Sequence, residues 1–223
     1  MFDILVGLDM TNRPQLAAAI LAGGRARRLG GTNKGTLTVG TTPIIDRQLD
    51  VLLALVRDVF VVGRDDPAWT ERGLRVVPDD IPGVGPLGGI YTAIRHSPAD
   101  RTLVVACDMP YLSRAFLERL TSVGDADLVI PRTTRGFEPL CAIYSRRCEA
   151  GIHERLRRGE YKAWKTPVDI RVAEVSVGDD LSVMSVNTPH DYERAKGLKE
   201  WKQETTGDRI TTRLERFTTD ADS

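Results

Sequence analysis

The stretch Leu16-Ala-Ala-Ala-Ile-Leu-Ala-Gly-Gly-Arg-Ala-Arg-Arg-Leu-Gly-Gly-Thr-Asn-Lys34 places a short apolar segment directly before a loop of glycines and cations. Residues 16–21 are apolar and short enough for a buried strand. Gly23 and Gly24 then allow positive φ angles, which bring bare backbone N–H groups close to an anion. The cationic side chains of the loop are Arg25, Arg27, Arg28 and Lys34. The stretch therefore predicts a binding site for a nucleoside triphosphate.

Two better-known glycine loops do not match this stretch. A Walker A loop ends in Gly-Lys-Ser/Thr, but here Asn33 precedes Lys34 and Gly35 follows it. The dinucleotide fingerprint G-x-G-x-x-G is missing as well. A surface loop with merely solvated arginines is the remaining alternative, and it is disfavoured because strand, glycines and cations agree. The pattern LAGG-x-x-x-R-hydrophobic-G-x-x-x-K is similar to the opening loop of the nucleotidyltransferase superfamily.

Composition indicates a soluble globular protein with no global charge preference. The chain has 223 residues, enough for one domain with a substantial core. Its 31 basic residues balance 31 acidic ones, so no overall field favours nucleic acid or an anionic membrane. We expect neither as a partner, and any cationic site must be local.

The first residues of the chain and the cysteine content indicate the cellular compartment. Residues 1–10 lack the basic and apolar regions of a signal peptide, and no stretch approaches a membrane span. The three cysteines, an odd number without C-x-x-C spacing, predict neither a disulfide framework nor a structural zinc site. A reducing cytoplasm fits these observations best.

Apolar runs and helical patterns alternate along the chain. We expect strands at 16–21, 36–39, 59–62, 74–77, 102–107, 127–130, 140–144, 172–177 and 183–186. We expect helices beginning near 44, around 90–94, at 114–121, near 147–158 and at 189–203. This alternation predicts a three-layer αβα sandwich with a mostly parallel, Rossmann-like sheet. Residues 1–14 would be an N-terminal extension, 15–203 the nucleotidyltransferase domain and 204–223 a poorly ordered tail.

In such a sheet, ligands bind beyond the carboxyl ends of the strands. The glycine loop follows the first strand, Gly63 and Asp79 follow later strands, and Asp108 follows the most apolar one. These residues should face one crevice. Asp108 could instead only cap its turn, and Asp79 could be solvated together with the adjacent Asp80.

Nucleotidyl transfer requires a held triphosphate, a divalent cation and an acceptor oxygen in line with the leaving pyrophosphate. Asp108 is the candidate Mg²⁺ ligand, because a carboxylate at the end of a central strand projects to where phosphate oxygens would lie. The catalytic set expected from the residues is Lys34, Arg28 and Asp108, with the metal. An acceptor that is itself a phosphate would need no general base.

The chain resembles the molybdenum cofactor guanylyltransferase family, the MobA-type enzymes. The motifs that carry this resemblance occur in the same order over residues 16 to about 197: LAGG with Arg25 to Gly31, Lys34-Gly35, Gly85-Pro86-Leu87-Gly88-Gly89, Cys107-Asp108-Met109-Pro110 and Asn187-Thr188-Pro189. The resemblance implies that GTP and molybdenum-bound molybdopterin give the guanine dinucleotide cofactor and pyrophosphate. Molybdoenzymes or other cofactor-biosynthesis proteins would be further partners of a monomer or weak oligomer.

Roles for individual residues follow from the resemblance. The backbone of Leu21, Ala22 and Gly23 would contact GTP, Lys34 would bind its phosphates, Asp79 would contact the nucleotide and Asp108 would hold Mg²⁺. Gly24, Gly85 and Asn187 complete the predicted nucleotide site. The pterin phosphate would lie near Gly159 to Lys162 and the basic helix carrying Arg155, Arg157 and Arg158, unless that helix face is only solvated.

Four positions depart from the family pattern, and one of them is Met109, which stands where threonine is frequent. Gly63 stands where the family commonly has an asparagine that contacts the nucleotide, Asn33 replaces an aspartate, and Ser185 replaces the first asparagine of Asn-x-Asn-Thr-Pro. These departures leave open another nucleotide or acceptor, such as the cytosine form of the cofactor, a sugar phosphate or an isoprenoid precursor. A non-catalytic nucleotide-binding or cofactor-binding module is the third hypothesis.

Overall fold

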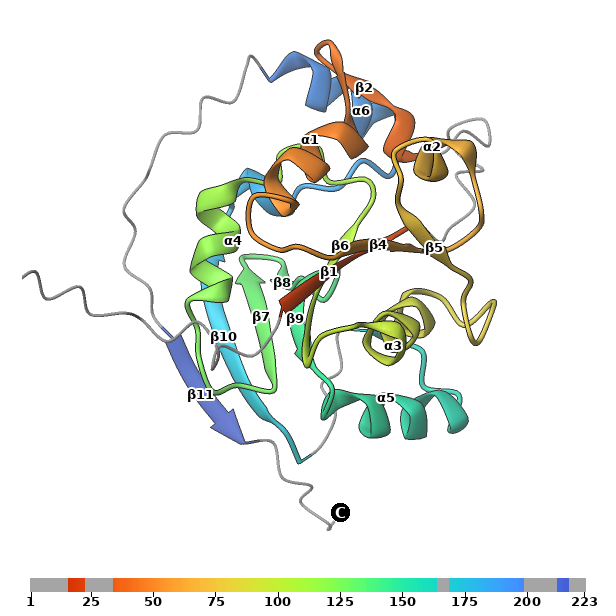
Figure 1. Cartoon of the computed structure of the whole chain (residues 1–223). Coiled ribbons are helices and arrows are strands. Elements are labelled where there is room, and N and C mark those ends of the chain that lie inside the picture. Colours follow the sequence, from red (N-terminus) through yellow and green to blue (C-terminus); the bar gives the residue numbers. More distant parts are fainter. Residues whose placement is uncertain (1–15, 23–33, 164–168, 199–211, 217–223) are drawn as a thin grey trace, which may run out of the picture.

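The computed structural model describes residues 16–22, 34–163, 169–198 and 212–216. One large sheet forms the centre of this part of the chain (Figure 1). In order across the sheet, its strands are β11 (Thr212–Arg216), β10 (Arg171–Gly178), β7 (Leu128–Thr133), β9 (Cys141–Ser145), β6 (Arg101–Ala106), β1 (Leu16–Leu21), β4 (Val59–Val62) and β5 (Arg75–Val77). β8 (Gly136–Phe137) pairs with β7, while β2 (Thr38–Val39) and β3 (Thr42–Pro43) form a separate ribbon.

The sheet is mixed but mostly parallel. β6, β1, β4 and β5 run parallel to one another, and β7 runs parallel to β10. β9 separates the two groups and is antiparallel to both β6 and β7, and β11 is antiparallel to β10. β6 therefore lies near the middle of the sheet, beside the parallel strand β1 on one side and the antiparallel strand β9 on the other.

Helices cover both faces of the sheet, so the predicted three-layer sandwich is confirmed. Figure 1 shows α1 (Ile44–Leu52) and α4 (Arg114–Thr121) on one side, and α3 (Pro86–His96) and α5 (Cys148–Arg157) on the other. Alternate residues of β1 enter two separate cores, because successive side chains of a strand point to opposite faces. Ala18 and Ile20 pack with α1 and α4, whereas Ala19 and Leu21 pack with α3.

Capping residues define several of the helix starts. Ser113 accepts a hydrogen bond from the N–H of Phe116 and caps α4, which spans the residues 114–121 expected from the sequence. α6 (Pro189–Gly197) begins with a reciprocal capping box between Thr188 and Asp191. The last segment of the expected helix, 199–203, lies outside the described residues, as do 1–14.

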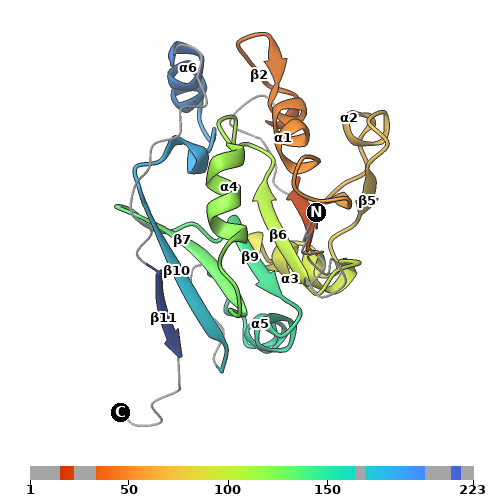
Figure 2. The same cartoon turned by 60° about the vertical axis from the view of Figure 1, so that its left-hand side comes forward.

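Some expectations for local structure are wrong. Residues 183–186 do not form a strand; a 3₁₀ turn, η3 (Leu181–Val183), is capped by Asp180, and Val186 donates its N–H to the carbonyl of Asp108. The loop expected between 59–62 and 74–77 contains the short helix α2 (Pro67–Thr70), and η2 (Lys34–Thr36) takes part of the strand expected at 36–39. In the expected tail, residues 212–216 pair with β10 as β11 (Figure 2).

No helix in the described segments is long and apolar enough to cross a membrane.

Candidate active site

Backbone hydrogen bonds join the residues that follow the parallel strands. Cys107 donates its N–H to the carbonyl of Leu21 at 3.1 Å, and Ala22 donates to Val62 at 2.8 Å. Gly63 continues the series by donating to Val77 at 2.9 Å. The chain segments leaving β6, β1, β4 and β5 thus stay in contact for one residue beyond the strands. This carboxyl edge is where the sequence places the ligand site.

Lys34, Asp108 and Asn187, called here the Lys34 cluster, meet at this edge. The Lys34 Nζ lies 2.7 Å from Oδ2 of Asp108 and 2.6 Å from Oδ1 of Asn187, and donates a hydrogen bond to each. The two partners are 74 and 153 residues away in sequence. The Lys34 and Asp108 side chains are only 19% and 10% exposed, so the ion pair is shielded from solvent more than a surface pair.

Asp108 retains an unused acceptor. Its Oδ1 is buried and has no hydrogen-bond partner among the described residues. A buried carboxylate oxygen without a donor is costly unless something else satisfies it. A hard divalent cation such as Mg²⁺ prefers such an oxygen ligand and needs few protein ligands. The donor set therefore fits a divalent metal, and in the part of the chain that the structure describes no group of three or more His, Cys, Asp or Glu side chains offers another site.

A residue that the sequence interpretation missed fixes the loop of Asp108. Gln48 of α1 is fully buried, and its Nε2 donates to the carbonyl of Ala106 at 2.7 Å and of Met109 at 3.2 Å. These two carbonyls flank Asp108 along the chain, so Gln48 ties both sides of the turn to α1. The sequence signal that could have identified Gln48 is that it is the one amide side chain on the apolar helix face formed by Ile45, Leu49 and Leu52.

The last described helix delivers Asn187 to the same place. Tyr192 of α6 donates its hydroxyl to the carbonyl of Thr38 at 2.7 Å, and the Tyr111 hydroxyl donates to the carbonyl of Ala195. Val39, Ile44, Tyr111 and Val186 share a small apolar core with α6. Figure 2 shows α6 beside the β2 ribbon, beyond the end of the sheet. Tertiary packing of α6 therefore holds Asn187 against Lys34.

Asp79 and its neighbour Asp80 have different surroundings. Asp80 is held by α3: its N–H donates to the Thr92 hydroxyl, its Oδ1 lies 2.9 Å from Nε2 of His96, and its Oδ2 lies 3.6 Å from Nε of Arg95. Asp79 is partly buried instead. Burial raises the pKa of Asp79 above its usual value, and the charge of Asp80 raises it further.

Asp79, Gly89, Ala22 and Gly63 form what is called here the glycine edge, on the β4 and β5 side of β1. A Cβ at Gly89 would lie 3.3 Å from a methyl group of Leu21 and 3.8 Å from Oδ1 of Asp79. The first turn of α3 therefore passes close to both, and glycine makes this approach possible. The structure brings Leu21 and Asp79 to the same place, as the sequence predicts.

Gly63 approaches the backbone of Ala22 even more closely. Its φ is +150°, and a Cβ here would lie 3.0 Å from the carbonyl carbon of Ala22 and 3.1 Å from its oxygen. Any side chain, including the asparagine common in the family, would have to displace the first residue of the glycine loop. The φ of Gly63 is also one that residues with a side chain rarely adopt, so a substitution here would strain the backbone.

The remaining predicted residues are distributed as follows. Gly85 is the N-cap of α3 with φ +75°, at the same end of the sheet and without a close contact to the Lys34 cluster. Gly23, Gly24 and Arg28 lie outside the described residues, as does Asn33. Arg155, expected near the pterin phosphate, is buried, donates to the carbonyl of Lys162 at 2.6 Å and faces Glu160.

The neighbouring arginines of that helix are paired as well. Arg157 and Arg158 both contact the carboxylate of Glu154, at 3.2 and 2.9 Å. This face of α5 therefore neutralises much of its own charge, which weakens the case for it as an anion site.

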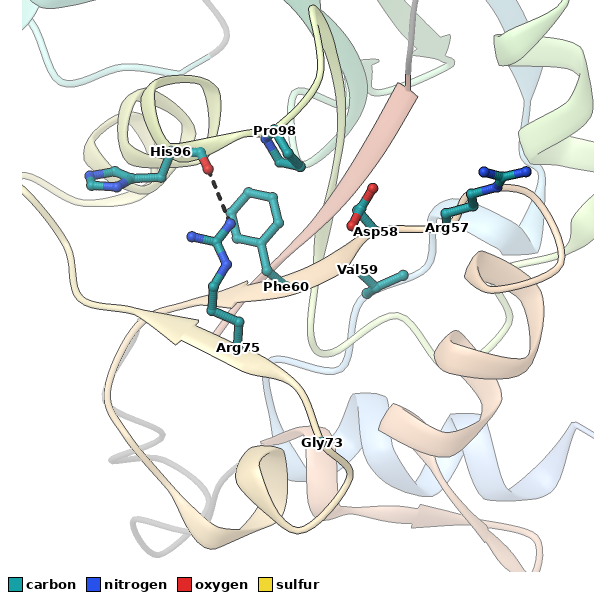
Figure 3. A pocket seen from close by; sticks show the side chains of 8 residues that line it. All are labelled: Arg57, Asp58, Val59, Phe60, Gly73, Arg75, His96 and Pro98. Atoms are coloured by element: carbon teal, nitrogen blue, oxygen red, sulfur yellow. Dashed lines mark hydrogen bonds between the residues drawn. The ribbon is translucent and has the colours of Figure 1, made fainter. Parts of the chain in front are cut away.

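A cavity of about 440 Å³ lies at the opposite, amino end of β4 and β5 (Figure 3). Its lining residues are Arg57, Asp58, Val59, Phe60, Gly73, Arg75, His96 and Pro98. Arg75 lies over the Phe60 ring and donates to the carbonyl of His96 at 3.1 Å. The cavity contains none of the predicted site residues.

A mostly parallel sheet between two helix layers, with a lysine and an aspartate meeting at its carboxyl edge, places the chain among Rossmann-like α/β proteins that bind ligands at this edge. Residues 18–169 match the family described as the MobA-like NTP transferase domain, and the chain belongs to this family. It is a nucleotidyltransferase.

Related sequences agree with this assignment, and solved structures share the fold. The chain is similar to probable molybdenum cofactor guanylyltransferases of Pelotomaculum thermopropionicum (35% identity, 83% of this chain and 94% of that protein) and Methanothermobacter thermautotrophicus (36% identity, 78% and 96%). In fold it is similar to the molybdopterin-guanine dinucleotide biosynthesis protein A of Archaeoglobus fulgidus (TM-score 0.63, 24% identity, 81% of this chain and 96% of that one). A manganese complex of a Mycobacterium tuberculosis protein is also similar in fold (TM-score 0.58, 20% identity, 82% and 99%).

Proposed function

We propose that this enzyme transfers GMP from GTP to molybdenum-bound molybdopterin, giving the guanine dinucleotide form of the molybdenum cofactor and pyrophosphate. The observation that carries the proposal is the Lys34 cluster, which joins a cation and a carboxylate with a free oxygen at the carboxyl edge of the sheet. The guanylyl group and the molybdenum cofactor come from the names of the relatives, which are probable molybdenum cofactor guanylyltransferases.

The residues have separate roles in this reaction. Lys34 and Arg28 stabilise the negative charge on the triphosphate as pyrophosphate leaves. Asp108 would hold Mg²⁺ through its Oδ1, which has no hydrogen-bond partner among the described residues. When bound, the metal neutralises charge at the α-phosphate.

The transfer of GMP requires no nucleophile from the protein, because one bond to the α-phosphorus forms as another breaks. A phosphate oxygen of the acceptor forms a bond to the α-phosphorus, and the bond from that phosphorus to the bridging oxygen of pyrophosphate breaks. The attacking oxygen is already anionic near neutral pH, so no general base is required. The protein contributes position and charge.

The nucleotide would lie along the glycine edge. The backbone of Leu21, Ala22, Gly23 and Gly24 would approach the phosphates, and Gly85 would present the start of α3 to an anion. Asp79 would accept hydrogen bonds from the nucleoside, and Asn187 completes the site beside Lys34. The enzyme would act in the cytoplasm as a monomer or weak oligomer and pass its product to molybdoenzymes or other cofactor-biosynthesis proteins.

A nucleotide panel tests the base assignment. Purified protein with molybdenum-bound molybdopterin and Mg²⁺ is given GTP, CTP, ATP or UTP in turn, and pyrophosphate and the dinucleotide product are measured. We expect turnover with GTP alone. Equal turnover with CTP would replace the guanine assignment by the cytosine form of the cofactor.

A second nucleotide or acceptor is favoured by one observation, the close approach of Gly63 to Ala22, which removes a family side chain from the nucleotide site. Sugar phosphates and an isoprenoid precursor would then be the acceptors to compare with molybdopterin. Pyrophosphate release with one of these and none with molybdopterin would establish this alternative. GTP-dependent thermal stabilisation without turnover on any acceptor would indicate a non-catalytic binding module.

A further inference from the structure

Lys34 forms an ion pair with the carboxylate of Asp108, which is the metal ligand in the proposed function. Its ammonium lies 2.7 Å from Oδ2 of Asp108, at the distance of a direct charged hydrogen bond. The single negative charge of Asp108 is thus already neutralised by a cation from the same chain. A divalent cation at Oδ1 would lie a few ångströms from this ammonium, and two cations at that separation repel each other strongly in a shielded site.

Asn187 offers the same ammonium a second, neutral acceptor. Its Oδ1 lies 2.6 Å from Nζ of Lys34. The amide oxygen is a neutral acceptor, so it can accept a hydrogen bond from Lys34 without competing with Asp108 for the charge of a metal ion. The position of Asn187 is also tied to Asp108, because the adjacent Val186 donates its N–H to the carbonyl of Asp108 at 2.9 Å. Lys34 therefore has a second acceptor at the site besides Asp108.

We propose that Lys34 is the resident counter-ion of Asp108 and blocks divalent metal binding until triphosphate oxygens draw its ammonium away. Asn187 is the positioning residue that keeps Lys34 beside the site during this exchange. The proposal rests on the assignment of Asp108 as the metal ligand. Its consequence is that the metal binds weakly alone and well together with the nucleotide.

The experiment measures metal affinity without nucleotide. Full-length protein is titrated with Mn²⁺, and free Mn²⁺ is followed by electron paramagnetic resonance. In Lys34→Met the Mn²⁺ affinity should rise about tenfold or more. A cationic neighbour lowers the proton affinity of a carboxylate by roughly one to three powers of ten, and we expect a change of similar size for a metal ion. Lys34→Gln, which can still donate to Asp108 but carries no charge, should also bind Mn²⁺ more tightly and guards against misfolding of the methionine variant.

Two further variants show where the gain arises. Lys196→Met removes an exposed lysine that pairs with Glu193 on α6, and its Mn²⁺ affinity should equal that of the wild type. Adding Asp108→Asn to Lys34→Met should abolish the gain. If neither Lys34 variant binds Mn²⁺ more tightly than the wild type, the counter-ion proposal is wrong.

This outcome is separable from failure of the proposed function. Unchanged Mn²⁺ affinity in the Lys34 variants, with turnover lost in Asp108→Asn, would reject the counter-ion and keep the metal ligand. Full turnover in Asp108→Asn would reject the metal ligand itself.

Discussion

The Lys34 cluster and the glycine edge lie on opposite sides of β1 and are built by opposite means. The first concentrates charge: an ammonium, a carboxylate and an amide lie within 2.7 Å contacts. The second removes side chains, so that Gly63 and Gly89 let backbone segments approach Ala22 and Leu21 closely. We infer that the Lys34 cluster stabilises the charge of the reacting phosphates, whereas the glycine edge leaves space for the nucleoside.

The two sides also depend differently on the chain. The contacts of the Lys34 cluster span 74 and 153 residues and rely on helices α1 and α6. The glycine edge rests on backbone hydrogen bonds between adjacent strand ends. Damage to the first should therefore change catalysis with little effect on the sheet, whereas damage to the second should change stability and binding together.

The largest effect is expected from Asp108→Asn. The amide keeps the shape and can still accept a hydrogen bond from Lys34, but it loses the charge that would hold the metal. We expect kcat to fall on the order of a thousandfold with modest change in GTP affinity. Steady-state kinetics and isothermal titration measure the two quantities.

The matched control for this change is Asp50→Asn, on an exposed position of α1. Its kcat should stay within about twofold of the wild type, as for most surface substitutions. An unchanged kcat in Asp108→Asn would contradict the proposal that the negative charge of Asp108 is needed for catalysis.

Gly63→Ala should have the next largest effect. The new methyl group would lie 3.0 Å from the carbonyl carbon of Ala22, at a φ of +150° that alanine rarely adopts. We expect a loss of about 1–3 kcal/mol in the free energy of unfolding. GTP affinity should fall about tenfold, because displacing the loop by even a small distance disturbs positioned contacts.

Gly73→Ala separates backbone strain from the contact with Ala22. Gly73 has φ +71°, but a Cβ there would meet nothing within 4 Å. This variant should lose stability while its GTP affinity stays the same, as measured by urea unfolding and calorimetry. A matching loss of GTP affinity in both variants would show that strain alone accounts for the effect.

The smallest effect is expected from Asp79→Asn, and its sign depends on pH. Burial raises the pKa of Asp79 in the folded protein above the usual 3.8, so ionisation of this carboxyl opposes folding. This loss in the free energy of unfolding is absent below the pKa that Asp79 has in the unfolded chain, and it grows as the pH rises through the pKa that Asp79 has in the folded protein. Asp79→Asn should therefore raise Tm by about 1–3 °C at pH 7 and by almost nothing near pH 3.

The same substitution should weaken GTP binding, since an amide presents one acceptor where the carboxylate presents two. Asp80→Asn is the comparison. Asp80 forms an ion pair with Arg95 and a hydrogen-bonded contact with His96, so its neutralisation should lower Tm. Thermal unfolding at both pH values distinguishes the two. A lower Tm in Asp79→Asn at pH 7 would contradict the assigned cost of its burial.

Much of the fold could be predicted because its signals are local. The strands expected at 16–21 and 59–62 and the helix starts expected at 114 and 189 each depend on a few adjacent residues, and the structure confirms them. The segment 183–186 misled the prediction because its apolar residues are buried by packing around η3 and α6, without pairing in the sheet.

The sequence by itself determined that a glycine loop follows β1 and that Asp79 and Asp108 follow strands of one sheet, since strand ends of a parallel sheet share an edge. Only the tertiary structure decided that β9 lies between β6 and β7, that Gln48 holds the turn of Asp108, and that Asn187 reaches Lys34. It also decided which acid of the Asp79-Asp80 pair is tied to α3 and which is left partly buried. Strand pairing and helix docking are set by the summed packing of distant residues, and no local pattern records that sum.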